Sequence, residues 1–211
     1  MVAVSDLRYR YGSERRLSFP DFTVEKGKAC LLLGNSGSGK TTLLHLMGGL
    51  LRIQVGKVEI EKQDLSLLSG PQADGFRGKH MGFIFQRNHL ISALTLKKNL
   101  LLAPFLANLR QDEQRVEEIL TQLGLWEKRN ARVHHLSHGE AQRAAIARAA
   151  LNRPAVIFAD EPTSALDDYH CERVIHLLLD ISRLNRCTLV VATHDQRLKS
   201  VILKQVHISN G

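Results

Sequence analysis

The strongest chemical signal in the sequence is a glycine-rich segment, Gly34-Asn35-Ser36-Gly37-Ser38-Gly39-Lys40-Thr41-Thr42. It fits the pattern G-x-x-x-x-G-K-[ST] and lies between an apolar run and a helical pattern. Its glycines let the backbone turn tightly, so that successive N–H groups face inward and hold phosphate oxygens. We expect Lys40 to reach the β- and γ-phosphates and the Thr41 hydroxyl to ligate Mg²⁺. The segment therefore predicts a site for ATP.

A second signal is the adjacent carboxylate pair Asp160 and Glu161, which follows the apolar run 155–159. Parallel sheets place their ligands at the carboxyl ends of their strands, and this pair stands at such an end. Asp160 can bind Mg²⁺ directly or through water. Glu161 can polarise the water that attacks the γ-phosphorus. Taken without the phosphate-binding segment, the two carboxylates could equally well cap the next element.

Several elements must position these groups, and their order alternates between strand and helix. Such an order predicts a mostly parallel sheet covered by helices. We expect a polar loop with a short helix over 64–80, and Asp112 as the N-cap of the second half of a helical stretch over about 95–124. The other expected elements are strands within 2–34, at 56–65, 81–86, 155–159, 187–193 and 204–209, and helices at 41–51, 137–152 and 170–184.

The composition limits the class of protein. The chain has 211 residues, 44% of them hydrophobic and 24% charged, which is typical of one globular domain. No apolar run reaches the roughly 18 residues of a membrane-spanning helix. The three cysteines lie far apart and form no pattern typical of a zinc site, so we interpret them as buried or incidental thiols. The net charge of +8 is compatible with an anionic ligand, a membrane surface or nucleic acid and does not choose among them.

The segment Leu136-Ser137-His138-Gly139-Glu140 resembles the LSGGQ signature of the ABC ATPase family. The family's other motifs are matched in the family's order over essentially the whole chain. They comprise the adenine-stacking aromatic at Tyr11, the Q-loop glutamine at Gln86, the D-loop at 164–167 and the switch histidine at His194.

This resemblance implies a P-loop NTPase fold of the ABC type over residues 1–211. The expected parts are a mostly parallel core sheet, an antiparallel β subdomain and a helical subdomain inserted at approximately 88–136. It also implies that two copies, turned head to tail, sandwich two ATP·Mg²⁺. Ser137, His138, Gly139, Glu140 and Asp167 would then contact the nucleotide held by the other copy. Glu161, His194 and Lys40 are the expected catalytic residues, and Thr41, Gln86 and Asp160 the expected metal ligands.

Two positions depart from the signature. His138 replaces its first glycine, and Glu140 replaces its final glutamine. The first turn of a helix does not require a positive φ, so a histidine can be accommodated there. The expected consequence is a side chain near the partner's nucleotide that slows hydrolysis or adds a pH-sensitive contact.

The stretch 82–107 is similar to the lipoprotein-release, macrolide-exporter and cell-division branch of the family (LolD, MacB and FtsE types). The resemblance implies a separate integral membrane subunit with few spans and a large periplasmic domain. That subunit would dock near Gln86 and the helical subdomain. The chain would then be cytoplasmic and peripheral on the inner face of the cell membrane, with no nucleic acid as partner.

Two alternatives stay open at this point. The basic charge is compatible with a soluble ABC ATPase that acts on nucleic acid, although about 95 residues without heptads separate Lys40 from Ser137. His138 is compatible with a regulatory module that binds ATP and hardly hydrolyses it. The sequence does not identify a cargo.

Overall fold

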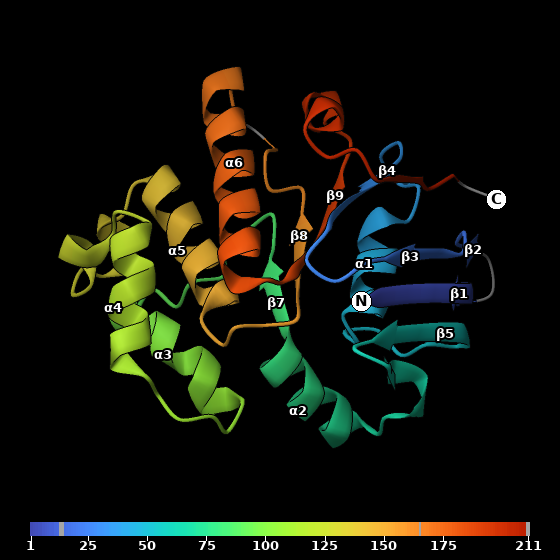
Figure 1. The fold of residues 1–211 in the computed structure, drawn as a ribbon, viewed down its shortest axis with the longest axis horizontal. Coiled ribbons are helices and arrows are strands. Elements are labelled where there is room, and N and C mark those ends of the chain that lie inside the picture. Colours follow the sequence, from blue (N-terminus) through green and yellow to red (C-terminus); the bar gives the residue numbers. More distant parts are fainter. Residues whose placement is uncertain (13–14, 165, 210–211) are drawn as a thin grey trace.

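The computed structural model describes residues 1–12, 15–164 and 166–209 and places its strands in two sheets (Figure 1). The sheet in the middle of the molecule has five strands, and every pairing within it is parallel. Its strands, in spatial order, are β10 (Gln205–His207), β4 (Ala29–Leu33), β9 (Thr188–Thr193), β8 (Val156–Asp160) and β7 (Met81–Ile84).

Both faces of this sheet are buried, which explains the continuous apolar runs of its strands. In β4, Leu31 and Leu33 face one hydrophobic cluster, and Cys30 and Leu32 face the other. The first cluster includes side chains of the helices α3 (Leu96–Leu106), α4 (Glu113–Gln122), α5 (His138–Ala150) and α6 (Asp168–Asn185). The second joins the parallel sheet to α1 (Lys40–Met47) and to the second sheet. All three cysteines are buried and unpaired, and burial raises the pKa of Cys30 to about 12.

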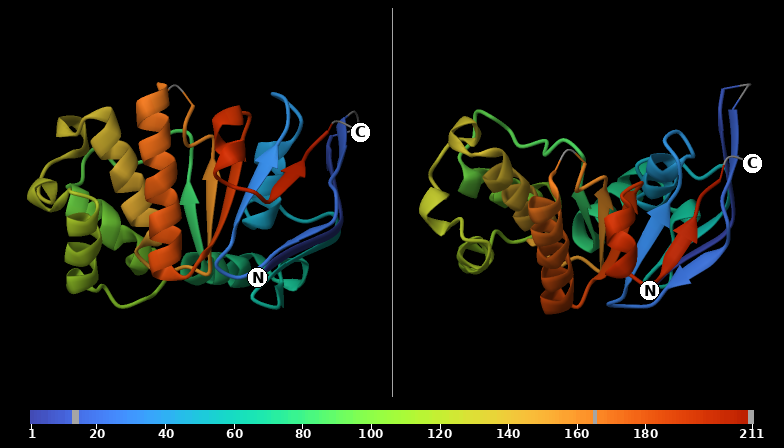
Figure 2. Two further views of the ribbon diagram at one scale, coloured as in Figure 1. Left: turned by 45° about the horizontal axis from the view of Figure 1, so that its top comes forward. Right: turned by 90° about the horizontal axis from the view of Figure 1, so that it is seen from above.

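The second sheet is antiparallel and lies at the opposite side of the molecule from the helices α3 to α6 (Figure 2). Its strand order is β2-β1-β5-β6, with β3 paired to β1. The bounds are β1 (Val2–Tyr11), β2 (Arg15–Ser18), β3 (Phe22–Val24), β5 (Val55–Ile60) and β6 (Gln63–Asp64).

The α-helices connect the strands of the parallel sheet and cover its two faces. They are α1 (Lys40–Met47), α2 (Gly70–His80), α3 (Leu96–Leu106), α4 (Glu113–Gln122), α5 (His138–Ala150) and α6 (Asp168–Asn185). Short 3₁₀ helices occur at Leu65–Leu67, Trp126–Lys128, Val133–His135 and Gln196–Ser200. Asp112 is the N-cap of α4, as the sequence predicts, and its side chain accepts from the N–H of Arg115 at 3.0 Å.

Three boundaries differ from the sequence-based expectation. The helix α1 ends at Met47 rather than at residue 51, because Gly48 and Gly49 follow and Gly49 has a φ of +63°. The segment expected to be mainly loop carries the 11-residue helix α2. Strand β7 ends at Ile84, so Gln86 lies two residues beyond the strand rather than at its end.

Candidate nucleotide site

The phosphate-binding segment leads from β4 into α1, as its pattern requires. Gly37 and Gly39 have φ values of +78° and +100°, which side chains other than glycine rarely adopt. Gly34 has no room for a side chain, because a Cβ there would lie 2.4 Å from both the Ile208 carbonyl oxygen and Ser38 Oγ. Gly39 is the N-cap of α1 and offers no side chain to the free N–H groups of the first turn. Those groups and the positive end of the helix dipole are left for an anion.

Lys40 lies across this segment and is only 7% exposed. Its ammonium donates to the carbonyl oxygens of Gly34, at 2.8 Å, and Asn35, at 3.1 Å. The hydroxyl of Ser38 is buried and has no hydrogen-bond partner. A buried polar group without a partner is costly, and a phosphate oxygen would satisfy it.

Thr41 and Asp160 bring two oxygen atoms together at the carboxyl end of the sheet. Thr41 Oγ1 donates to Asp160 Oδ1 at 3.2 Å. Burial is the main influence on the Asp160 carboxyl and raises its pKa. A hydroxyl and one carboxylate do not enclose a cation, but Mg²⁺ commonly takes its remaining ligands from water and substrate phosphates. Gln86 leaves the same edge of the sheet, since the register pairs Ile84 with Ala159, and it is exposed.

Glu161 lies at the centre of a group of polar side chains. Its Oε2 accepts from Thr193 Oγ1 at 2.9 Å, and its Oε1 lies 2.8 Å from His194 Nδ1. Lys40 Nζ is 3.9 Å from the same Oε1. Glu161 has a φ of +47°, an unfavourable backbone conformation for a residue with a side chain. Such strain is frequent at functional sites. Here the strained conformation places the carboxylate between a lysine and a histidine.

Tyr11 comes from the antiparallel sheet and reaches the same region. Its hydroxyl lies 3.2 Å from Thr42 Oγ1, and its ring contacts that of Tyr9 edge to face. The Tyr11 side chain stays 43% exposed, so one face of the molecule keeps an aromatic ring next to the start of α1.

The signature segment forms the N-terminus of α5. Ser137 is the N-cap and accepts from the N–H of Glu140 at 3.2 Å, while the Glu140 carboxylate accepts from the N–H of Ser137 at 2.8 Å. The Ser137 N–H bond is the main influence that lowers the pKa of Glu140. His138 is the first helical residue and has an ordinary helical backbone.

A pocket of about 810 Å³ lies beside this helix end, between α5, α6 and the end of α4. Its lining includes Ser137, His138 and Gly139, together with Arg143 and Arg173. The described residues that line it include none from the phosphate-binding segment 34–42. Asp167 is the N-cap of α6 and accepts from the N–H of His170 at 2.9 Å. The predicted residues therefore form two groups within one chain.

Sequence reasoning missed several residues that hold these groups in place. Thr193 and Asp195 flank the predicted histidine, and Arg197 bonds to Asp195. Their sole sequence signal is that they lie within three residues of His194. The buried Gln142 donates to the Pro162 carbonyl oxygen at 2.5 Å and so ties α5 to the loop after Glu161. Its one sequence signal is its place on the helix that follows the signature.

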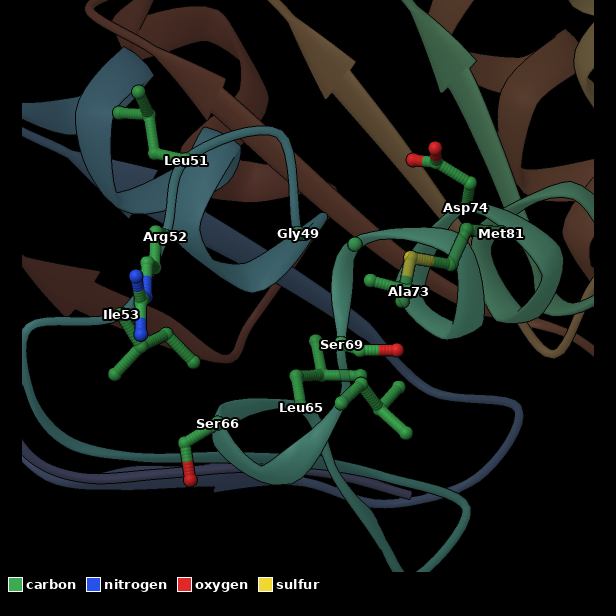
Figure 3. Close-up of a pocket in the computed structure, with 12 residues that line it drawn as sticks. Gly49, Leu51, Arg52, Ile53, Leu65, Ser66, Ser69, Ala73, Asp74 and Met81 are labelled. Atoms are coloured by element: carbon green, nitrogen blue, oxygen red, sulfur yellow. The ribbon is translucent and has the colours of Figure 1, made fainter.

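Two pockets beside α2 lie away from these groups. One, of about 450 Å³, lies between segment 49–53, the 3₁₀ helix Leu65–Leu67 and α2 (Figure 3), and its described lining residues include none of the predicted site residues. The other, of about 460 Å³, lies between α2, β7, α3 and α5. Its lining includes Phe83, Phe85 and Leu106, and the exposed Phe105 is adjacent to Leu106 in α3. Arg77, on α2, donates to the Gly49 carbonyl oxygen between the two pockets, at 2.7 Å.

Comparisons with known proteins give consistent matches. The family model described as ABC transporter matches residues 17–164. The lipoprotein-releasing system ATP-binding protein LolD of Leptospira interrogans is 36% identical over 211 residues, which cover 100% of this chain and 89% of that protein. The bacitracin export ATP-binding protein BceA of Halalkalibacterium halodurans is 35% identical over 193 residues, 90% of this chain and 76% of that protein.

Among solved structures, a dimeric post-hydrolysis state of the ATP-binding cassette MJ0796 bound to ADP and Pi is similar. It has a TM-score of 0.87 and 31% sequence identity, and the match covers 100% of this chain and 95% of that one. Within the part of the chain that the structure describes, no helix is long and apolar enough to cross a bilayer.

Proposed function

The chain belongs to the ABC transporter family, and from this premise we propose how its residues divide the work of binding and hydrolysing ATP. It is an ATP-binding and ATP-hydrolysing subunit that works as a dimer and powers a membrane partner. The cluster of Lys40, Glu161, Thr193 and His194 is the single observation that carries the assignment of roles.

Residues 34–42 hold the triphosphate through backbone N–H groups at the N-terminus of α1. Lys40 exchanges its bonds to the Gly34 and Asn35 carbonyl oxygens for the β- and γ-phosphates, and Ser38 gains the partner that its hydroxyl lacks. Tyr11 stacks on the adenine ring. The position of its hydroxyl beside Thr42 supports this role, because it puts the ring within reach of a nucleotide bound there.

Thr41, Asp160 and Gln86 are the residues that would hold Mg²⁺. When bound, the cation neutralises charge on the phosphate oxygens. The pair Thr41–Asp160 fits such a site because it supplies two hard oxygen ligands next to the phosphate-binding turn.

Glu161 orients the attacking water and accepts its proton, and His194 holds the carboxylate and donates to the γ-phosphate. The carboxylate is 15% exposed and is fixed by two hydrogen bonds, so its geometry is set before the nucleotide binds. Preorganised groups of this kind reduce the reorganisation needed in the transition state.

The second half of each site comes from the other copy. Ser137, His138, Gly139, Glu140 and Asp167 contact its nucleotide. Two observations support this arrangement: the signature pocket is separate from the phosphate-binding segment, and the N-terminus of α5, the positive end of its dipole, lines that pocket.

The groove between α2, β7, α3 and α5 receives the membrane subunit. Apolar side chains make up most of its lining, which includes Leu106 at 70% accessibility, and the preceding residue of α3, Phe105, is 61% accessible. Exposed apolar groups that cluster around a hollow are typical of protein–protein contacts. Phe85 lines this groove and directly precedes Gln86, so docking of the membrane subunit would shift the position of Gln86 relative to the nucleotide.

The membrane partner is of the few-span type with a large extracytoplasmic domain. The likeness to a lipoprotein-releasing ATP-binding protein along the whole chain supports this branch. The chain then lies on the cytoplasmic face of the membrane through that partner.

The substitution Glu161→Gln tests the central roles. It keeps the shape of the side chain and removes its basicity, so turnover should fall on the order of 10²- to 10⁴-fold. ATP should still drive the variant into a stable dimer, seen by light scattering at a concentration where the parent dimer hydrolyses its ATP and dissociates. Glu127→Gln, at a carboxylate that is 91% exposed, is the matched control and should behave as the parent. Parent-rate turnover by Glu161→Gln would remove the assigned role.

A further inference from the structure

The loop that carries the partners of the catalytic carboxylate is tied to the N-terminal part of α6 by the Arg197 guanidinium and by the Cys171 thiol. We propose that Arg197 is a positioning residue that couples the two nucleotide sites of the dimer. It joins the segment 193–197, which serves the chain's own nucleotide, to the segment 166–168, which faces the second copy. This inference rests on the proposed roles of Glu161 and Asp167.

The first link runs from Glu161 to Asp195. Thr193 Oγ1 donates to Glu161 Oε2 at 2.9 Å and accepts from the Asp195 N–H at 3.0 Å. Thr193 is fully buried, so this hydroxyl has no water to exchange with. A shift of the Asp195 backbone therefore reaches the carboxylate through a single hydroxyl group.

The second link is the Asp195 carboxylate, which is 12% exposed and accepts from several donors. Thr163 Oγ1 donates at 2.9 Å and Cys171 Sγ at 3.4 Å. Arg197 donates from Nε at 2.9 and 3.1 Å and from Nη2 at 2.7 Å. The Arg197 hydrogen bonds are the main reason that the pKa of Asp195 lies far below its usual range.

The third link leads from Arg197 to α6. Nη1 donates to Asp168 Oδ1 at 2.5 Å, and Nη2 donates to the Leu166 carbonyl oxygen at 3.4 Å. Asp168 is the first residue of α6, and Asp167 is its N-cap. The guanidinium thus contacts the residues on both sides of Asp167, through the backbone carbonyl of Leu166 and the side-chain carboxylate of Asp168. Asp167 is the residue proposed to contact the partner's nucleotide.

The geometry assigns this task to arginine in particular. The planar guanidinium presents several N–H donors in a fixed fork, and here different edges of the fork serve Asp195 and Asp168. A lysine ammonium is a single point and cannot reproduce both sets of bonds. A chain of contacts between two sites is not by itself evidence that the sites are energetically coupled. The test must therefore measure the cooperativity between the two nucleotide sites.

The experiment is a steady-state ATPase titration over ATP concentration with the full chain, comparing Arg197→Gln, Arg197→Lys, Asp168→Asn and the double variant Arg197→Gln/Asp168→Asn. We expect Arg197→Gln to lower turnover roughly 2- to 30-fold and to bring the Hill coefficient close to one. Lysine should not restore either value. Asp168→Asn should act in the same direction, and the double variant should be no worse than Arg197→Gln. Arg183→Gln, at an exposed ion pair on the same helix, should match the parent.

Three results would each overturn the inference. The Hill coefficient of Arg197→Gln could equal that of the parent protein, or the parent protein could itself have a Hill coefficient of one. The loss of turnover in the double variant could equal the product of the losses in the two single variants. Thermal unfolding of every variant checks that it is folded. Should Arg197→Gln not fold, Asp168→Asn still decides the matter, because Asp168 is 94% exposed and its loss leaves Asp195 paired. These results are distinguishable from a failure of the proposed function, which would show itself as parent-rate ATP turnover by Glu161→Gln.

Discussion

At the residue scale, the Glu161 carboxylate lies at the centre of the polar side chains to which we assign catalytic roles. It stands between Thr193, His194 and Lys40 on a backbone with a φ of +47°. The acidic pair and the lysine could be predicted from the sequence, because their spacing relative to strands and turns is diagnostic. Thr193, Asp195 and Arg197 could not, because hydroxyl and guanidinium partners depend on which loops the fold brings together.

His138 is the residue that departs most from the family signature, and its effect can be measured. It is exposed at the start of α5 and lines the pocket proposed to face the partner's nucleotide. Contacts of this kind at a helix end are worth about 0.3–1 kcal/mol, so His138→Gly should change turnover roughly 2- to 5-fold. We expect an increase.

The sequence also predicts a pH-sensitive contact at His138, and ATPase assays of His138→Gly at saturating ATP over a range of pH test it. An unchanged activity together with an unchanged pH profile would remove the idea that His138 modifies the site.

At the element scale, the strands and most helices followed from their apolar patterns. The buried strands of the parallel sheet are continuous apolar runs, and α6 has a clear apolar face. The sequence predicts only a short helix within 64–80, because the segment of α2 contains three glycines and has no fully buried residue. The signals for its start were nevertheless present, since Ser69 and Gln72 form a capping box and Pro71 stands in the first turn.

The packing of α5 against β7 leads to a prediction about stability. A Cβ at Gly82 would lie 2.2 Å from the Ala149 carbonyl oxygen, so Gly82→Ala must displace backbone. Overpacking of this kind costs about 1–3 kcal/mol in the free energy of unfolding. Gly75, in α2, would meet nothing within 4 Å, so Gly75→Ala should instead stabilise by about 0.5–1 kcal/mol. Urea unfolding measures both, and midpoints that move in the same direction would contradict the account.

At the scale of the whole molecule, the chain presents two incomplete surfaces. The predicted nucleotide residues lie in two sets, which we propose to meet when a second copy is added, and a largely apolar groove lies between α2, β7, α3 and α5. The fold class and the order of the motifs were predictable from the sequence. The sequence predicts a docking region near Gln86 and the helical subdomain but not the groove itself, because the shape of the groove depends on how α2 and α3 pack around β7.

The central claim is that this ATPase works on a membrane protein, and affinity capture from detergent-solubilised membranes tests it most directly. Glu161→Gln is used with ATP, because it should hold the dimer closed. The account predicts capture of an integral membrane protein with few spans and a large extracytoplasmic domain, lost when Phe105→Asp and Leu106→Asp are added. A multi-span permease would contradict the branch and keep the ATPase. Capture of nucleic acid without any membrane protein would contradict the claim itself.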